Sequence, residues 1–566
     1  MKLSTPSTVQ RRLSLLAAAA LTVIASSATA QVVKDEYADF EGGPLWLPAD
    51  TDGLSKALPV SDFGIQSLGG LPKYLSSTAS VGLSFKGVSQ FDLRNMLGGS
   101  YIPPDTMGAV GTSQFMETTN GVYAIYKKSV GSLVSKMRSD TFWANAGATG
   151  GLNGDARLQF DKTSQKWIAL QFGASVSDIQ IAVSTTSDAT GPWKSTKFTG
   201  FAGGTADYPT LAIDKDAVYI GTNNFNGSGN FSGTTLNVIA RSDLLGAAAP
   251  STTSLKQFVT PYPGTGVDGG FAIQGVNSET GSGKVIAASL FYNDSIRFNI
   301  ANPGTAAATK GATTYLNLTD YGSTGGGRQP DHTRNIDAFD QRIGASTWEM
   351  NGKIYAVYGA TSVGSTHNEV RFVVTDAATN AVIQEGVIGD ANYDYYQGSL
   401  SVNASGQVVI GYNRSGYQTT DANGDGLADG NVSLMARTYY TDASGKLVQK
   451  DELLLHVSPV SDYHNGSFQG QAATGRQRWG DYSAVTIDPN NSQNFWVIGE
   501  YAEVWNNAAG CTPGNPPGCT QSGGSTWGTW ISEITLAPVP EPGTYALMLT
   551  GLALMGATAR RRAAKA

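Results

Sequence analysis

Short apolar runs separated by turn-forming residues recur along the middle of the chain. A typical unit has an Asp before a short apolar strand, as in residues 206–214, then a turn and a second apolar and aromatic strand at 217–221. A third strand often follows, as at residues 236–240. Strand, turn, strand, loop and strand in this order, repeated every ~50 to 65 residues, is typical of the blades of a β-propeller.

Four units match one another closely and three match more weakly. The close matches begin at residues 104, 154, 206 and 480, and the weaker ones pair 270–273 with 284–288, 342–343 with 353–357, and 399–402 with 408–412. Seven units between Pro104 and Thr535 predict an all-β fold, a β-propeller of seven blades, and six or eight blades remain compatible with the spacing. The main alternative is a stack of β-sandwich domains, but linkers rich in Pro, Ser or Thr are not evident after residue 104.

Composition agrees with a chain of many tight turns. Gly contributes 69 of the 566 residues, above the usual ~7%, and long amphipathic helical patterns are missing after Gln31. Without residues 1–30 and 537–566, 31 basic and 44 acidic residues remain, a net charge of −13. Such an acidic chain argues against nucleic acid or anionic lipid as a partner.

The first thirty residues have the pattern of a signal peptide. Lys2, Arg11 and Arg12 precede an apolar stretch at 13–24, and Ala28-Thr29-Ala30 forms a small-residue cleavage site. We therefore expect residues 1–30 to be removed and the mature chain to begin at Gln31. Residues 31–103 show no repeat and are predicted to be an N-terminal extension, either an exported leader or an added strand region, before a propeller at 104–536.

The last thirty residues, 537–566, have the pattern of a sorting tail. Val539, Pro540, Glu541 and Pro542 form a turn that breaks a preceding strand or helix. An apolar stretch at 545–559 then predicts a hydrophobic sorting helix that enters the membrane, and Arg560, Arg561 and Arg562 hold its end on the cytoplasmic side. A plain C-terminal anchor is the alternative, although fifteen apolar residues fall short of the ~20 that span a bilayer comfortably.

This order of parts resembles the PEP-CTERM family of exported bacterial proteins. The resemblance implies that a membrane protease, an exosortase, recognises and cuts the tail, so the expected partners are exosortase and, transiently, the inner membrane. It also implies a cell-surface or extracellular destination and an association with extracellular polysaccharide systems. The same tail is also named an ice-binding protein C-terminal domain, which implies no ice binding by this chain. The resemblance covers the tail only, so it predicts where the protein goes and not what it does.

The chain has two cysteines, Cys511 and Cys519, which flank a segment of Pro, Gly and Asn that must bend. In an oxidising compartment this bend could bring the two sulfurs together, so we predict a local disulfide. A zinc site is the alternative, but two thiols without a nearby histidine are an incomplete ligand set.

Four of the repeated aspartates could meet at the centre of the propeller. The start of each innermost strand faces the central channel, which predicts Asp105, Asp155, Asp207 and Asp481 at one channel mouth. Clustered carboxylates raise one another's pKa, so such a ring suits metal binding or acid-base chemistry. In the alternative interpretation each Asp bonds the backbone N–H groups of its own turn.

Residues 421–429 carry the clearest metal motif. Their sequence, Asp-Ala-Asn-Gly-Asp-Gly-Leu-Ala-Asp, resembles the calcium loops of EF-hand, dockerin and thrombospondin-like repeats. We predict calcium as a cofactor, with ligands from Asp421, Asn423, Asp425, the Leu427 carbonyl and Asp429. Val432 stands where an EF-hand has its bidentate Glu, which favours a propeller loop over a helix-loop-helix. A solvated hairpin without metal is the alternative.

Enzyme motifs are few. Of the four histidines, His332 lies in a polar loop and is the best candidate for catalysis or ligand contact, with a plain surface position as the alternative. Residues 187–193 resemble a degenerate Asp-box turn of sialidase-like propellers. Sialidases use an arginine trio for a substrate carboxylate and a tyrosine for chemistry, and the resemblance implies Arg157, Arg334, Arg478 and Tyr482 for these roles.

Two functions follow from these patterns. The first is a noncatalytic exported protein that binds glycans or other matrix components. The second is a secreted glycan-active hydrolase or lyase, which as a glycosidase would need two accessible carboxyl groups ~5 to 10 Å apart. The acidic residues look dispersed and turn-like, so the sequence favours binding, although a fold alone does not decide a function.

Overall fold

The computed structural model describes residues 31–34 and 79–538, apart from residues 150–153, 174, 247, 263–265, 282, 333, 339, 465–476 and 506–523. Three predictions lie outside these residues: the signal peptide, the disulfide between Cys511 and Cys519, and the sorting motif from Val539 to Arg562.

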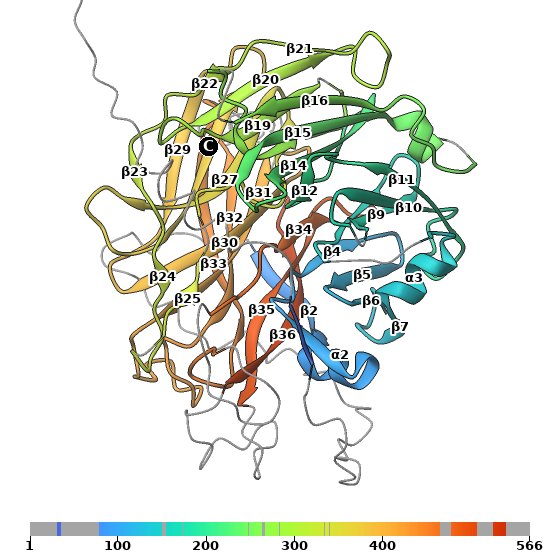
Figure 1. The fold of residues 1–566 in the computed structure, drawn as a ribbon. Helices are drawn as coiled ribbons and strands as arrows, with labels where there is room; N and C mark the ends of the chain where they lie inside the picture. Colours follow the sequence, from blue (N-terminus) through green and yellow to red (C-terminus); the bar gives the residue numbers. More distant parts are fainter. Residues whose placement is uncertain are drawn as a thin grey trace, which may run out of the picture.

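Seven sheets of four to six strands make up most of the fold (Figure 1). Neighbouring strands within a sheet are mainly antiparallel and follow one another along the chain, so each sheet is one blade. The seven-bladed β-propeller is therefore confirmed. The sequence pattern works because pairing within a blade is local: Ala212 and Ile213, for example, pair with Tyr219 and Val218 across one turn.

The first three blades follow the strand order predicted from the sequence most closely. In each of them the chain runs from the innermost strand outward. Blade 1 contains β4 (Met107–Val110), β5 (Gln114–Thr119), β6 (Val122–Lys127) and β7 (Leu133–Arg138). Blade 2 contains β8 (Arg157–Asp161), β9 (Lys166–Phe172), β10 (Asp178–Ser184) and β11 (Trp193–Thr199). Blade 3 has β12 (Gly204–Asp207) and β13 (Ala212–Ile213) inside, then β14 (Ala217–Asn226), β15 (Phe231–Ala240) and β16 (Lys256–Pro261).

The next three blades are more irregular at their edges. Blade 4 contains β17 (Phe271–Gly275), β19 (Lys284–Ala288) and β20 (Ser295–Ala301), with β21 (Thr309–Lys310) and β22 (Thr314–Tyr315) outside. Blade 5 contains β18 (Asn277–Ser278), β26 (Trp348–Met350), β27 (Lys353–Ser362), β28 (Glu369–Asp376) and β29 (Val382–Ile388), and β23 (Tyr321–Gly322) pairs with β27. Blade 6 contains β30 (Tyr393–Val402), β31 (Gln407–Gly416), β32 (Ser433–Thr441) and β33 (Leu447–Val457).

Blade 7 is built from both ends of the propeller sequence. It contains β34 (Ala484–Ile487), β35 (Asn494–Trp505), β36 (Ser525–Leu536) and, as its outermost strand, β2 (Ala79–Ser89). β2 pairs antiparallel with β36, which places Ala79 opposite Leu536 and closes the ring. The structure differs here from the boundary expected at residue 104, because a strand within the assigned N-terminal extension completes the last blade.

A buried carboxylate holds this closing strand against blade 1. Glu117, on β5, accepts hydrogen bonds from the Val88 N–H (3.0 Å), the Tyr126 hydroxyl (2.9 Å) and the Thr529 hydroxyl. Glu117 is fully buried, and burial raises the pKa of its carboxyl group from 4.5 to about 7. Gly87 leaves room for this group, because a Cβ there would lie 2.6 Å from Glu117 Oε2.

Short elements connect or extend the blades. The helix α2 (Gln90–Leu97) follows β2 directly; the Ser89 N–H donates to Asp92 Oδ2 (2.9 Å) at its start, and left-handed Gly98 (φ 73°) ends it. The other short elements are α3 (Ser139–Asn145), a π-helical turn at Ser242–Gly246, and the strand pairs β1 (Gln31–Lys34) with β3 (Gly99–Ile102) and β24 (Gly326–Gly327) with β25 (Ile336–Asp337).

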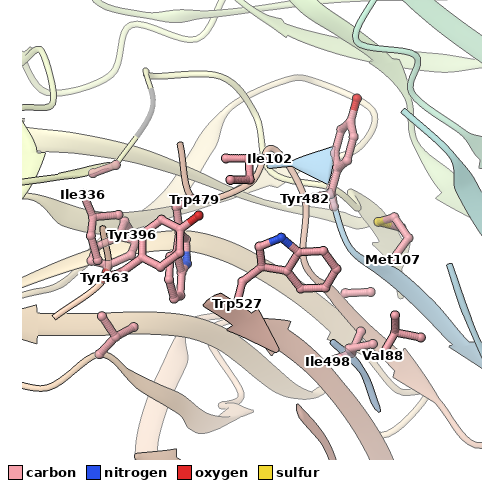
Figure 2. Close-up of a cluster of buried hydrophobic side chains, with 14 of the residues drawn as sticks. Val88, Ile102, Met107, Ile336, Tyr396, Tyr463, Trp479, Tyr482, Ile498 and Trp527 are labelled. Atoms are coloured by element: carbon pink, nitrogen blue, oxygen red, sulfur yellow. The ribbon is translucent and has the colours of Figure 1, made fainter. Parts of the chain in front are cut away.

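Apolar side chains fill the space between neighbouring blades. Ile181 of β10 and Val218 of β14, for example, belong to one cluster that joins blades 2 and 3. A larger cluster combines side chains of blades 1, 3, 4, 6 and 7, among them Met107, Tyr396 and Ile498 (Figure 2). Burial of this kind supplies most of the favourable free energy of folding.

The ends of the strands define two faces of the propeller. We call the face on which the innermost strands begin the mouth face. On the opposite face, the turn face, each innermost strand turns into the second strand of its blade, as where Val402 of β30 pairs with Val408 of β31. The chain leaves blade 7 on the turn face, because the Leu536 N–H donates to the carbonyl of Gln493, which lies in the turn between β34 and β35 (2.9 Å).

Candidate functional site

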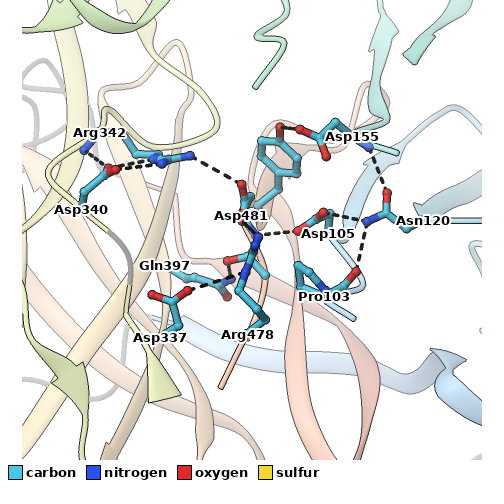
Figure 3. A network of polar contacts seen from close by, with 12 residues as sticks. Pro103, Asp105, Asn120, Asp155, Asp337, Asp340, Arg342, Gln397, Arg478 and Asp481 are labelled. Carbon is cyan, nitrogen blue, oxygen red and sulfur yellow. Dashed lines mark hydrogen bonds and ion pairs between the residues drawn. The ribbon is translucent and has the colours of Figure 1, made fainter. Parts of the chain in front are cut away.

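A chain of hydrogen bonds joins blades 1, 2 and 7 where their innermost strands begin (Figure 3). Asp105 Oδ1 accepts from the Asp481 N–H (2.9 Å), and Asp105 Oδ2 accepts from Asn120 Nδ2 (2.6 Å). The Asn120 amide oxygen accepts from the Asp155 N–H (2.9 Å), and Asp155 Oδ2 accepts from the Tyr482 hydroxyl (2.9 Å). The aspartates at three blade starts are therefore parts of one network.

Two arginines extend this network toward blade 5. Arg342 donates two hydrogen bonds to Asp340 (2.7 and 2.8 Å), and its Nη1 lies 3.5 Å from Asp481 Oδ2. Arg478 Nη2 donates to Asp481 Oδ1 (3.0 Å), and its Nε lies 3.7 Å from Asp337 Oδ2. The guanidinium groups thus lie between carboxylates on both sides and neutralise part of the buried negative charge.

A third arginine packs against the tyrosine of this network. The guanidinium carbon of Arg157 lies 4.4 Å from the centre of the Tyr482 ring, and Arg157 Nη2 donates to the Ala345 carbonyl (2.9 Å). Arg157 therefore lies against Tyr482, whereas the guanidinium carbon of Arg342 lies 4.2 Å from the centre of the Tyr208 ring. The backbone carbonyl of Arg334, the third arginine of the sequence interpretation, accepts a hydrogen bond from Gln329 (2.7 Å).

Burial and mutual repulsion control the protonation of these acids. Burial, with the nearby charges of Asp481 and Asp155, raises the pKa of Asp105 well above its usual range. Burial and the charge of Asp481 raise the pKa of Asp155 to about 6. The pKa of Asp207 is also raised well above its usual range, by burial and by the charges of Asp155 and Asp481. The four aspartates therefore influence one another electrostatically.

Glu500 is a further buried acid in this region. It lies on β35 with its side chain fully buried, and Oε1 is 3.4 Å from the Thr106 N–H that donates to it. Burial and the charge of Asp105 raise the pKa of Glu500 well above its usual range. No repeated unit marked this residue, because it lies on a second strand and meets the network only through folding.

A recurrent backbone conformation places the residues at the blade starts. Asp105 (φ 51°), Asp155 (φ 63°), Tyr208 (φ 50°) and Gln397 (φ 53°) are left-handed although none is glycine. Each lies just before its innermost strand or at a kink within it. Asp tolerates this conformation better than most residues. Asp105 and Asp155 therefore serve the backbone as well as the charge network.

The Asp-box-like segment forms the turn between β10 and β11 in blade 2. Asp188 Oδ1 accepts from the Thr190 N–H (2.9 Å) and from Gln114 Nε2 of blade 1 (2.8 Å). The Trp193 indole, buried beneath the turn, donates to the Ala189 carbonyl (2.8 Å). These contacts fix the turn and join it to the next blade, which is a structural role.

The predicted calcium loop connects β31 to β32 and is exposed in large part. Asp421 accepts hydrogen bonds from the N–H groups of Gly424 (2.7 Å), Asp425 (3.0 Å) and Gly426 (2.8 Å), and Asp425 Oδ1 accepts from Leu427 (2.8 Å). Within the described residues, no group of three or more His, Cys, Asp or Glu side chains is arranged to hold a metal. Calcium binding by this loop stays a prediction.

The histidines fall into two pairs. His456 is buried and stacked on Trp530 (3.9 Å between ring centres), and burial lowers the pKa of His456 to about 3. His464 is also buried, with Nε2 2.8 Å from Asp331 Oδ2. His332 is exposed, and its ring stacks on that of Tyr417 (3.9 Å between centres, 18° between planes). His367 is half-buried and contacts Arg328.

The C-terminal end of the chain identifies its route. Residues 538–562 match the PEP-CTERM protein-sorting motif. The chain carries a PEP-CTERM sorting tail. It is therefore an exported protein, sorted by an exosortase to the cell surface by way of the membrane. Among the described residues, no helix is both long and apolar enough to cross a membrane.

Beyond the sorting tail, comparisons with known proteins give structural likeness only. No curated protein matches the sequence. The WD40 domain of SCAP from fission yeast is similar with a TM-score of 0.31 at 7% identity, covering 75% of this chain and 80% of that one. A protein of unknown function from Dyadobacter fermentans has a TM-score of 0.34 at 9% identity, covering 76% and 94%. The β-propeller domain of the Trilobed protease from Pyrococcus furiosus has a TM-score of 0.30 at 8% identity, covering 69% and 88%.

Proposed function

We propose that this PEP-CTERM protein is a noncatalytic propeller that binds glycans or other matrix components at the cell surface or outside the cell. The observation that supports the absence of catalysis is the state of the carboxylates at the blade starts. Asp105 is 1% and Asp155 5% exposed, and each holds a backbone or side-chain donor of another blade. These acids are occupied in joining blades and are covered from a polymeric substrate.

A glycosidase would need a different arrangement. Two carboxyl groups must flank the scissile bond in a cleft that admits the sugar chain. Here Arg342 is already paired with Asp340 and Arg478 with Asp481 inside the buried network. The sorting tail adds the second support, since it delivers the propeller to the surface where extracellular polymers are found.

A secreted glycan-active hydrolase or lyase of the sialidase-like type is the second candidate. The observation in its favour is that Arg157 packs against the ring of Tyr482, whose hydroxyl donates to Asp155 (2.9 Å), and that Arg342 and Arg478 both lie beside the neighbouring Asp481. Burial and the neighbouring charge of Asp155, however, raise the pKa of Tyr482 well above its usual range. A tyrosine that is so hard to ionise is a poor nucleophile.

The test measures binding and turnover on the same samples. The full chain, in mild detergent, is exposed to a panel of acidic and neutral polysaccharides, with retention on immobilised glycan and release of reducing ends as the two readouts. We expect retention without turnover, unchanged in Tyr482→Phe. Turnover by the wild type that is lost in Tyr482→Phe would instead establish the hydrolase or lyase. If none of the polysaccharides is retained, the proposal of glycan binding is wrong.

A further inference from the structure

The exit of the sorting tail orients the two faces of the propeller. The chain leaves on the turn face, where Nε2 of Gln407, the first residue of β31, donates to the Ala537 carbonyl (2.8 Å). The apolar stretch of the tail begins at Tyr545, and the few residues between can reach no further than about 30 Å. The sorting tail therefore starts from the turn face, and the mouth face is the outward face, opposite the start of the tail.

One cluster of aromatic and basic side chains lies on this outward face. Tyr417 directly follows β31, whose last residue pairs with the first residue of β30. His332 lies between β24 and β25, and His367 lies between β27 and β28. Arg328 contacts both Tyr417 and His367. We call these four residues the Tyr417 cluster.

Hydrogen bonds to the buried Asp394 fix the direction of the Arg328 side chain. Its backbone N–H and its Nε both donate to Asp394 Oδ2 (2.9 and 2.6 Å). Asp394 is fully buried, and its other oxygen accepts from the Asn368 N–H (2.7 Å). The anchored edge of the guanidinium leaves its two Nη groups directed at His367. A guanidinium fixed in this way loses little rotamer freedom when it binds an anion.

The aromatic part of the cluster is exposed and ordered by its neighbours. Tyr417 is 36% exposed, with the His332 ring stacked on it and the Arg328 guanidinium carbon 5.4 Å from its ring centre. His332 reaches this position with a left-handed backbone (φ 58°). A non-glycine residue in that conformation is held by its surroundings, and such residues concentrate at binding sites.

We propose that the Tyr417 cluster binds an acidic saccharide. The flat, exposed stack of His332 and Tyr417 suits the apolar C–H face of a sugar ring, and the Nη groups of Arg328 suit a carboxylate or sulfate on that sugar. Without residues 1–30 and 537–566 the chain has a net charge of −13, so the guanidinium beside this exposed aromatic ring is a local exception with the sign that an acidic ligand needs. This inference rests on the proposed glycan binding and names its surface and its ligand class.

The test compares matched variants on matched polymers. The full chain in mild detergent is titrated with polygalacturonate, dextran sulfate and neutral dextran, and its affinity is measured by calorimetry. We expect the wild type to bind an acidic polymer and not dextran, and Tyr417→Ala and His332→Ala to weaken that binding at least tenfold. Tyr440→Ala is the control, because Tyr440 also packs against a cation, Lys450 Nζ (4.5 Å from its ring centre), but toward the turn face of the same blade.

Each outcome has a separate meaning. Equal affinity of Tyr417→Ala, Tyr440→Ala and the wild type would overturn the surface while leaving glycan binding intact. Binding of dextran as tight as that of dextran sulfate would overturn the acidic class. Failure of every polysaccharide to bind would overturn the proposed function together with this surface. Poly-glutamate that competes as strongly as polygalacturonate would identify an acidic peptide as the partner instead. Thermal unfolding of Tyr417→Ala at the wild-type temperature shows that the variant is folded.

Discussion

Glu117 offers the sharpest test of how the ring is closed. Its carboxyl group is fully buried between blade 1 and the two outer strands of blade 7, and it accepts hydrogen bonds from Val88, Tyr126 and Thr529. Glu117→Gln keeps the shape and keeps an oxygen for the Val88 N–H, while its amide can donate to one of the two hydroxyl groups. The variant removes only the ability to ionise.

The magnitude follows from the pKa of this group. A folded-state pKa of about 7 against 4.5 for the ordinary carboxyl corresponds to roughly 3 kcal/mol of free energy. Below pH 4.5 both folded and unfolded chains carry the proton, so the group contributes no pH dependence. Between these two values the folded chain holds the proton that the unfolded chain releases, so the free energy of unfolding falls as the pH rises. Above pH 7 the folded chain has also released the proton, so the loss in free energy of unfolding reaches its full value and no longer changes with pH.

The assay is urea unfolding of wild type and Glu117→Gln at intervals from pH 4.5 to pH 8. We expect the free energy of unfolding of the variant minus that of the wild type to increase by roughly 3 kcal/mol from pH 4.5 to pH 8. Other buried acids, such as Asp155, titrate in both proteins and cancel in the difference. Glu279→Gln, a surface change, serves as control. Parallel pH curves for wild type and Glu117→Gln would refute the reasoning.

Three further predictions test other parts of the chain. Calcium should raise the temperature of thermal unfolding of the wild type but not of Asp425→Ala, and no rise in the wild type would remove the calcium prediction. Gly87→Ala should cost about 1–3 kcal/mol in urea unfolding, because its Cβ would meet Glu117 Oε2 at 2.6 Å; Gly227→Ala, where a Cβ meets nothing within 4 Å, should stay close to the wild type. His456 has a pKa of about 3 against 6.5, so the unfolded chain binds its proton first and stability falls as the pH drops below 6.5. His456→Phe should reduce that fall between pH 7 and pH 4, and an unchanged fall would contradict the assignment.

The blades could be predicted from the sequence because the strands within each blade pair with their neighbours along the chain. Each unit places its first two strands a few residues apart, so an alternation of apolar runs and turns is enough to recognise it. The closing strand β2 could not be found in this way, because its partner β36 lies more than 440 residues further along the chain. Its pattern, with Gly82 and Gly87 among apolar residues, resembles no other unit.

The site was predictable only where it follows the repeat. Asp105, Asp155 and Asp481 stand out because they recur at the start of a unit, and the structure places them in one network. Glu500 meets that network from β35 and carries no repeated signal, whereas Arg342 stands at the start of one of the weaker units. His332 was singled out by the polarity of its loop, whereas its stacking partner Tyr417 lies in another blade and belongs to no motif.

The closure of blade 7 sets an order of events during synthesis. The N-terminal residues leave the ribosome first, so β2 appears at the start and has to wait for β36, which is almost the last strand to be made. Until then the outer edge of β35 lacks its final neighbour, and an unpaired strand edge favours association with other chains. The sorting tail follows β36 immediately. Completion of the ring and presentation of the tail to the membrane therefore become nearly simultaneous, which makes a finished propeller a natural condition for release at the surface.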